Sequence, residues 1–138
     1  MTHSDTQNEN QDEDSKINIL VIDDETTTLK MTKQGLERSG FNVAIFSRPM
    51  ESVEYFKDNH QVINLVITDK NMPQMSGLQL IEEFRKYNTE IPIFVLTGFS
   101  DPSEDQQMKK MGATKILMKP LSIRDIIKEI KTLFKMDL

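Results

Sequence analysis

Short apolar runs alternate with longer amphipathic segments along the chain after residue 16. Five runs are rich in Ile, Val, Leu or Phe on both faces, which is typical of strands buried on both sides in a parallel sheet. They lie at residues 17–22, 42–46, 65–67, 91–96 and 115–118. Pro92 stands near the beginning of the fourth run, where a missing N–H does least harm. The pattern therefore predicts five buried strands.

The segments between and after these runs carry helix signals. Predicted helices occupy residues 26–39, 102–111 and 123–134, and two more begin at Pro49 and after Gly77. A Thr at the start of the first helix, Ser100 or Asp101 before the fourth, and Ser122 before the last are candidate caps. Apolar residues recur at helical spacing in the second helix (Met50, Val53, Phe56), the third (Leu80, Phe84, Tyr87) and the last (Ile123, Ile126, Ile127, Ile130, Leu133, Phe134).

Five strands that alternate with five helices predict an α/β fold of one domain. Short strand–helix connections favour a doubly wound, five-stranded parallel sheet with right-handed crossovers. In the flavodoxin-like strand order 2-1-3-4-5, the first and third strands flank the topological switch point. Ligands of such sheets bind at the carboxyl ends of the strands.

Composition separates a leader from the domain. Residues 1–15 hold five of the 22 acidic residues and no Lys or Arg, which leaves 17 acidic residues against 17 Lys and Arg in residues 16–138. We expect residues 1–15 to be a disordered acidic tail and residues 16–138 to be the folded domain. The balanced charge of the domain argues against DNA binding. The chain has no cysteine, no secretory leader and no apolar run of the ~20 residues that span a membrane, which favours a cytoplasmic protein.

Polar residues stand where four of the five predicted strands end. Asp23 and Asp24 follow the first strand, Asp69 the third, Thr97 the fourth and Lys119 the fifth. Taken singly, each is explained as a turn, a cap or a surface residue; four together on the same edge of the sheet are not. Three carboxylates without His or Cys indicate a hard cation such as Mg²⁺, or Mn²⁺. A lysine and a hydroxyl opposite the cation suit a phosphoryl group, and one carboxylate can act as the nucleophile.

This set of residues resembles the receiver domain of two-component response regulators, in particular the single-domain type of the chemotaxis regulators. The motifs that carry the resemblance are Asp23-Asp24, Asp69-Lys-Asn-Met-Pro73, Thr97-Gly98 and Lys119-Pro120, and it covers about residues 16–138. The resemblance implies that Asp69 accepts a phosphoryl group from a phosphohistidine of a sensor kinase or a phosphotransfer protein. It also implies that Asp24, Asp69 and the backbone carbonyl of Asn71 bind Mg²⁺, with Asp23 acting largely through water.

The same resemblance assigns the remaining positions. Lys119 pairs with the phosphoryl oxygens, Thr97 swings its hydroxyl onto them, and the Lys119–Pro120 peptide bond is cis. In the family, the positions of Asn71 and Phe99 border the phosphate. Our own hypothesis is that Phe99 shields the phosphate partly from water; core packing or a partner contact is the alternative. Ile116 departs from the family pattern, since receivers usually carry an aromatic residue there that moves inward together with the Thr. Ile has no ring to rotate and a stiff side chain, which puts that coupling in doubt.

Three functions fit these residues. The first is a stand-alone receiver, a non-enzymatic phosphoacceptor with intrinsic autodephosphorylation, whose phosphorylation changes a surface for an unknown downstream protein. The second is an aspartate-nucleophile phosphohydrolase, but that class places a second Asp two residues after the nucleophile, where this chain has Asn71. The third is a degenerate receiver that binds partners without phosphorylation. The end of the last predicted helix close to Leu138 favours a regulator without an effector domain.

Overall fold

A computed structural model describes residues 16–137 of the chain. The predicted disordered acidic tail, residues 1–15, lies outside the described residues. The strands are β1 (Asn18–Ile22), β2 (Asn42–Phe46), β3 (Leu65–Asp69), β4 (Ile93–Thr97) and β5 (Lys115–Met118). The helices are α2 (Thr26–Arg38), α3 (Pro49–Asn59), α4 (Gly77–Arg85), α5 (Pro102–Met111) and α6 (Ile123–Leu133).

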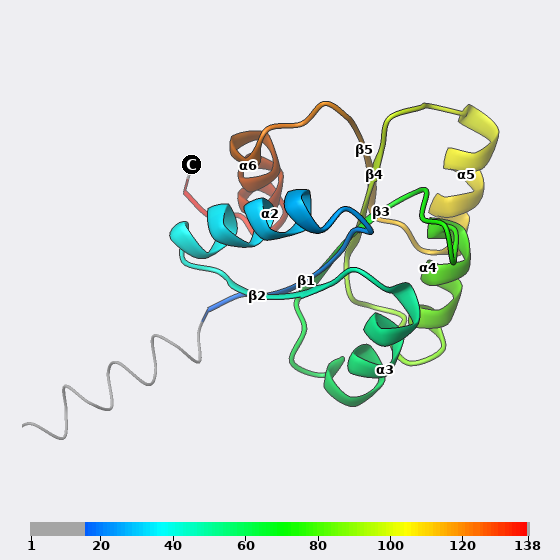
Figure 1. The fold of residues 1–138 in the computed structure, drawn as a ribbon, viewed down its shortest axis with the longest axis horizontal. Coiled ribbons are helices and arrows are strands. Elements are labelled where there is room, and N and C mark those ends of the chain that lie inside the picture. The colour runs from blue at the N-terminus through cyan, green and yellow to red at the C-terminus, as the bar shows by residue number, and fades with distance from the viewer. Residues whose placement is uncertain (1–15, 138) are drawn as a thin grey trace, which may run out of the picture.

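The five strands form one parallel sheet in the order β2-β1-β3-β4-β5. Helices α2 and α6 cover one face of this sheet, and α3, α4 and α5 cover the other (Figure 1). The predicted α/β fold and strand order are therefore confirmed. β1 and β3 are neighbours at the centre of the sheet, and the helices that follow them go to opposite faces, so their carboxyl ends meet at the topological switch point.

Alternating side chains of the central strands supply two separate cores. Ile19 and Val21 point to the α2–α6 face, whereas Leu20 and Ile22 point to the face of α3, α4 and α5. These four side chains and those of residues 65–68 in β3 are almost completely buried. Packing on both sides thus fixes the register of the central strands, because a shift by one residue would exchange the two faces.

The helix starts confirm some sequence signals and correct others. Ser122 and Asp101 cap α6 and α5 as predicted, and Ser76 forms a capping box with Gln79 at the start of α4. The expected Thr cap of the first helix is wrong, because Glu25 occupies the N-cap position of α2 and makes no side-chain cap bond.

Two residues expected on apolar stripes face solvent instead. Met50 of α3 is 51% exposed, although Val53 and Phe56 are buried as predicted. Tyr87 lies beyond the end of α4 and is 36% exposed. The third predicted helix is α4, and its apolar stripe is shorter than the spacing of Leu80, Phe84 and Tyr87 indicates. Leu80, Ile81 and Phe84 make its buried apolar surface.

Candidate functional site

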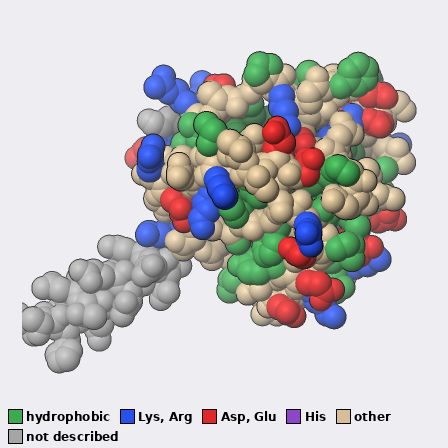
Figure 2. Space-filling view, in the orientation of Figure 1, with side chains coloured by type: hydrophobic (Ala, Val, Ile, Leu, Met, Phe, Trp, Pro, Cys, Tyr) green, Lys and Arg blue, Asp and Glu red, His purple; other side chains and the backbone are tan. Residues whose placement is uncertain are grey.

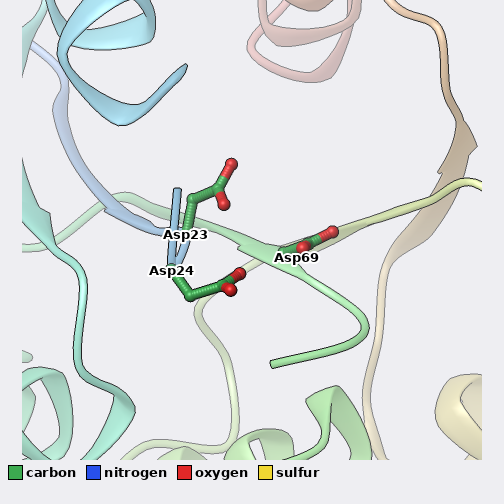
Figure 3. A group of neighbouring side chains, drawn as sticks. All are labelled: Asp23, Asp24 and Asp69. Atoms are coloured by element: carbon green, nitrogen blue, oxygen red, sulfur yellow. The ribbon is translucent and has the colours of Figure 1, made fainter. Parts of the chain in front are cut away.

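The predicted acidic residues converge where β1 and β3 end. Each of Asp23, Asp24 and Asp69 offers a carboxylate oxygen, and these three oxygens lie within 4.8 Å of one another. Figure 3 shows the three side chains at the ends of these adjacent strands. Asp23 and Asp69 are 46 positions apart in the chain. They meet because β1 and β3 pair in parallel, with Ile22 opposite Thr68.

Asp23 is the most buried of the three, at 8% exposure. Its carboxylate accepts a hydrogen bond from the backbone N–H of Glu25 at 3.0 Å. Burial raises the pKa of Asp23, and the negative charges of Asp69 and Asp24 add to this effect, against the opposing influence of the Glu25 N–H and Lys119. The metal-free cluster thus carries unfavourable electrostatic energy that a cation would relieve.

Lys119 reaches the same cluster from the loop after β5. Its ammonium group lies 2.8 Å from Oδ1 of Asp69, and its backbone N–H donates to the carbonyl of Thr97 at 2.8 Å. The Lys119–Pro120 peptide bond is cis, as the sequence predicts. Burial lowers the pKa of Lys119, but the hydrogen bond and charge of Asp69, with those of Asp23 and Asp24, outweigh it, so the pKa is raised. Lys119 therefore places a positive charge in contact with the carboxylate of Asp69, the predicted nucleophile.

Thr97 is buried at the end of β4, and its hydroxyl makes hydrogen bonds with the backbone of the loop that follows this strand. The hydroxyl donates to the carbonyl of Phe99 at 2.7 Å and accepts from the Phe99 N–H at 3.1 Å. The hydrogen of the hydroxyl is therefore directed at the loop between β4 and α5. The predicted contact of Thr97 with a phosphoryl group on Asp69 stays a prediction.

The remaining predicted positions lie in the loops after β3 and β4 and in β5. Asn71 is exposed in the loop between β3 and α4, and the side chain of Phe99 is 70% exposed. Ile116 is half-buried in β5, opposite Val95, and packs against the core on the α3–α4–α5 face. An aliphatic side chain thus occupies the position where receivers usually carry a ring.

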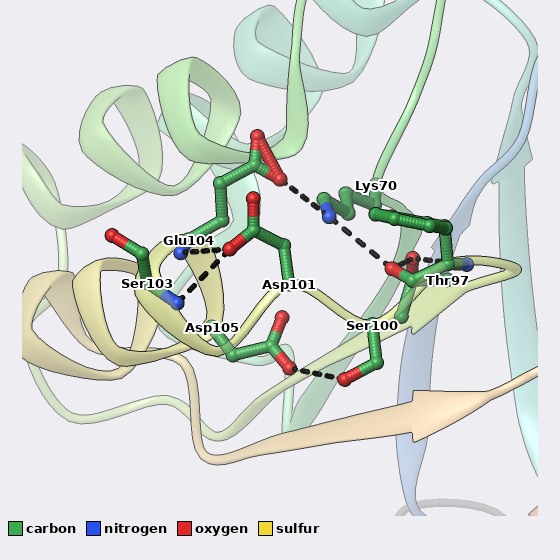
Figure 4. Close-up of polar contacts among 8 residues, drawn as sticks. Lys70, Thr97, Ser100, Asp101, Ser103, Glu104 and Asp105 are labelled. Atoms are coloured by element: carbon green, nitrogen blue, oxygen red, sulfur yellow. Dashed lines mark hydrogen bonds and ion pairs between the residues drawn. The ribbon is translucent and has the colours of Figure 1, made fainter.

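Sequence reasoning missed Lys70, which follows Asp69 directly. Its side chain is 7% exposed and forms an ion pair with Glu104 of α5 at 2.5 Å. Its ammonium group also lies 3.4 Å from the carbonyl of Phe99. Figure 4 shows this ammonium between the Glu104 carboxylate and the loop that follows Thr97. The available signal was its position, since a lysine at the end of a strand buried on both sides needs an acidic partner.

The donor set fits a hard divalent cation. Oxygen ligands from carboxylates, with a backbone carbonyl and water, are those that Mg²⁺ takes in proteins, usually through one or two carboxylates. Asp24 and Asp69, with the carbonyl of Asn71, would hold the ion directly, and Asp23 would act through water. The convergence of three carboxylates and the raised pKa of Asp23 both fit a site that is completed by positive charge.

Comparison with known proteins identifies the family. The family model of the response regulator receiver domain matches residues 19–131. The two-component response regulator ARR10 of Arabidopsis thaliana is 30% identical over 108 residues, which are 78% of this chain and 19% of that protein. The transcriptional regulatory protein ZraR of Escherichia coli is 30% identical over 110 residues, 80% of this chain and 24% of that protein. The chain thus spans a quarter or less of the length of these two relatives.

Solved structures agree with this match. A response regulator receiver domain protein of Clostridium thermocellum has a TM-score of 0.80 and 34% identity, over 86% of this chain and 94% of that one. A CheY-like receiver domain protein of Methanospirillum hungatei has a TM-score of 0.81 and 30% identity, over 88% of this chain and 95% of that one. Within residues 16–137, no helix combines the length and the apolar character needed to cross a membrane.

Proposed function

The chain belongs to the response regulator receiver domain family, and from this premise we propose that Asp69 is its phosphoacceptor. Receiver domains are signalling modules of two-component systems. The observation that carries the assignment to Asp69 is its geometry: its carboxylate contacts the Lys119 ammonium at 2.8 Å and shares a cluster with Asp23 and Asp24. None of the other described carboxylates meets both a lysine and two further acids in this way.

The proposed reaction is a transfer between two proteins. A carboxylate oxygen of Asp69 attacks the phosphorus of a phosphohistidine, so that the O–P bond of an aspartyl phosphate forms and the P–N bond of the donor breaks. The imidazole leaves with the electron pair of that bond and takes up a proton from water. Mg²⁺, when bound by Asp24, Asp69 and Asn71, supplies positive charge that offsets the charge of the phosphoryl oxygens.

Lys119 and Thr97 have separate roles in this transfer. Lys119 holds Oδ1 of Asp69 in the resting protein, and we expect its ammonium to move onto a phosphoryl oxygen as the transfer proceeds. Thr97 must turn its hydroxyl away from the Phe99 carbonyl to donate to another phosphoryl oxygen. The chemistry thus requires a short rotation at Thr97, which links the phosphorylated state to the loop between β4 and α5.

The test is to map a labile adduct. Wild-type protein treated with Mg²⁺ and phosphoramidate, a small donor with a P–N bond, should gain one phosphoryl group, which mass spectrometry places on Asp69. Asp69→Asn should abolish the adduct with little loss of stability, because the amide has the size of the carboxylate. Asp58→Asn, an exposed acid of α3, is the matched control and should be phosphorylated like the wild type. An adduct on another residue would overturn the assignment.

The same experiment separates the two other functions. Continuous release of phosphate from phosphate monoesters would indicate the phosphohydrolase. Asn71 argues against it, because an amide cannot act as the general acid for a leaving group. A wild-type protein that accepts no phosphoryl group from the small donor or from a cognate kinase would instead be the degenerate receiver. The intact set of Asp69, Thr97 and Lys119 supports the phosphoacceptor.

The partners and the organisation of the protein stay predictions. We expect the donor to be a sensor histidine kinase or a phosphotransfer protein, and the output to be a surface that binds a downstream protein. On the face shown in Figure 2, Lys and Arg side chains are interspersed with Asp and Glu, which supports our expectation that the domain does not bind DNA. A cytoplasmic location, a domain boundary near residue 16 and a single-domain protein are further predictions, which localisation, limited proteolysis and the mass of the endogenous protein would test.

A further inference from the structure

We propose that Lys70 is a positioning residue for Thr97, acting through the carbonyl of Phe99. The inference rests on the proposed function, in which Thr97 donates to a phosphoryl group on Asp69. It concerns what determines how readily the Thr97 hydroxyl leaves its resting partner. The elements that meet at this point are the ends of β3 and β4 and the first turn of α5.

The Phe99 carbonyl is an acceptor shared by two donors. The Thr97 hydroxyl donates to it at 2.7 Å, and the Lys70 ammonium lies 3.4 Å away from it. A carbonyl oxygen has two lone pairs, so both donors can be present together. When Thr97 turns toward Asp69, the carbonyl loses its shorter bond. Lys70 is the described side chain already in place to replace that bond.

The surroundings of Lys70 keep its ammonium at this carbonyl. The side chain is 7% exposed, which confines the ammonium between the Phe99 carbonyl and the carboxylate of Glu104, its ion-pair partner at 2.5 Å. The backbone of Lys70 is fixed as well, because its N–H donates to the Leu96 carbonyl of β4 at 2.9 Å and its own carbonyl accepts from the Gly77 N–H at 2.6 Å. Because the Lys70 ammonium is already confined near the Phe99 carbonyl, shortening the hydrogen bond between them costs little entropy.

The expected direction follows from this exchange of donors. With Lys70 present, the Phe99 carbonyl keeps a charged donor after Thr97 turns, so the turn is less costly. With Met at position 70, which keeps the apolar stem but lacks the terminal ammonium, Thr97 is the remaining described donor and holds its resting rotamer more firmly. Glu104 competes with the carbonyl for the ammonium, so a neutral residue at 104 should have the opposite effect.

The decisive experiment is a double-mutant cycle with Thr97. Affinity for beryllofluoride, a tetrahedral phosphoryl analogue, is measured in saturating Mg²⁺ for the wild type, K70M, T97V and K70M/T97V. K70M should weaken binding about three- to tenfold when Thr97 is present, a change within the range of one typical net hydrogen bond. In the T97V background, which lacks the hydroxyl, K70M should have no further effect.

Three further measurements complete the design. E104Q, which removes the negative charge but keeps an amide oxygen at a half-exposed position, should tighten beryllofluoride binding about two- to threefold, and only when Thr97 is present. K115M removes another Lys–Glu ion pair, to Glu129 of α6 at 2.8 Å, and should bind like the wild type. Affinity for Mg²⁺ alone should not fall in K70M, because the Lys70 ammonium pairs with Glu104 and the Phe99 carbonyl and not with the acids of the cluster.

The possible outcomes are distinct. Equal losses from K70M in both backgrounds would mean that Lys70 acts through general electrostatics or stability, and would overturn the inference. So would a loss of affinity in E104Q, or an unchanged affinity in K70M. Absence of beryllofluoride binding and of any adduct in the wild type would contradict the proposed function itself, and with it this inference.

Discussion

Phe99 separates the roles of a backbone group and a side chain at one residue. Its carbonyl accepts hydrogen bonds from Thr97 and Lys70, whereas the residue as a whole is 70% exposed. A substitution that shortens the side chain leaves the carbonyl in place. The ring can therefore be tested for shielding without removing the bonds that hold Thr97.

We predict that Phe99→Ala accelerates autodephosphorylation severalfold. The physical reason is access, because a ring beside the acyl phosphate excludes water that would attack the phosphorus. The rate is measured by loss of the labile adduct after removal of the phosphodonor. Tyr87→Ala, at an exposed aromatic beyond the end of α4, is the control and should leave the rate unchanged. An unchanged rate in Phe99→Ala would contradict the shielding.

At the scale of elements, the turn from α5 into β5 depends on a glycine. Gly112 caps α5 with φ of 118°, a backbone conformation that side-chain-bearing residues rarely adopt. A Cβ atom at this position would meet the guanidinium of Arg85, which donates to the Gly112 carbonyl at 2.6 Å. Gly40, after α2, also has a positive φ of 94°, but a Cβ atom there would meet nothing within 4 Å.

We predict that Gly112→Ala destabilises the protein more than Gly40→Ala does. Both variants bear the cost of a positive φ, about 1–2 kcal/mol. Gly112→Ala also displaces Arg85, whose partly buried guanidinium then loses a partner, at an additional cost of about 1–3 kcal/mol. Urea denaturation of the two variants measures the difference directly. Equal losses would show that Arg85 adapts without cost.

The helices and strands were predictable from sequence because the local apolar pattern of each segment agrees with its burial in the folded sheet. The strands are apolar on both faces, and the acids of the site stand at their ends, so strand order alone brings Asp23, Asp24 and Asp69 together. Met50 and Tyr87 were misplaced because helical spacing does not reveal where the neighbouring elements stop covering a helix. Lys70 was missed because its partner Glu104 is 34 residues away and on another element, a pairing that no local pattern reports.

At the scale of the whole molecule, the acidic cluster that we propose to bind the metal ion lowers the stability of the metal-free protein. The raised pKa of Asp23 means that the folded protein holds its proton to a higher pH than the unfolded chain, whose reference value is 3.8. Stability of the metal-free protein is thus reduced progressively as the pH rises from about 3.8 through the raised pKa, and the full penalty is present above it. Below both values the acid is protonated in both states and the penalty is absent.

We predict that Asp23→Asn stabilises the metal-free protein at pH 7. The neutral amide removes the buried charge and its repulsion by Asp69 and Asp24, and each 1 kcal/mol relieved should raise Tm by about 4 °C in a domain of this size. The gain should shrink as the pH is lowered toward 3.8 and vanish below it. The exposed Asp58→Asn, measured at the same pH values without metal, should show no comparable gain.

Adding Mg²⁺ at ten times its dissociation constant should stabilise the wild type by about 1.4 kcal/mol. The same concentration should stabilise Asp23→Asn less, because one acid of the cluster is gone. If Asp23→Asn were instead less stable than the wild type at pH 7 without metal, the bond from the Glu25 N–H would outweigh the repulsion, and the cluster would be a structural element of the fold.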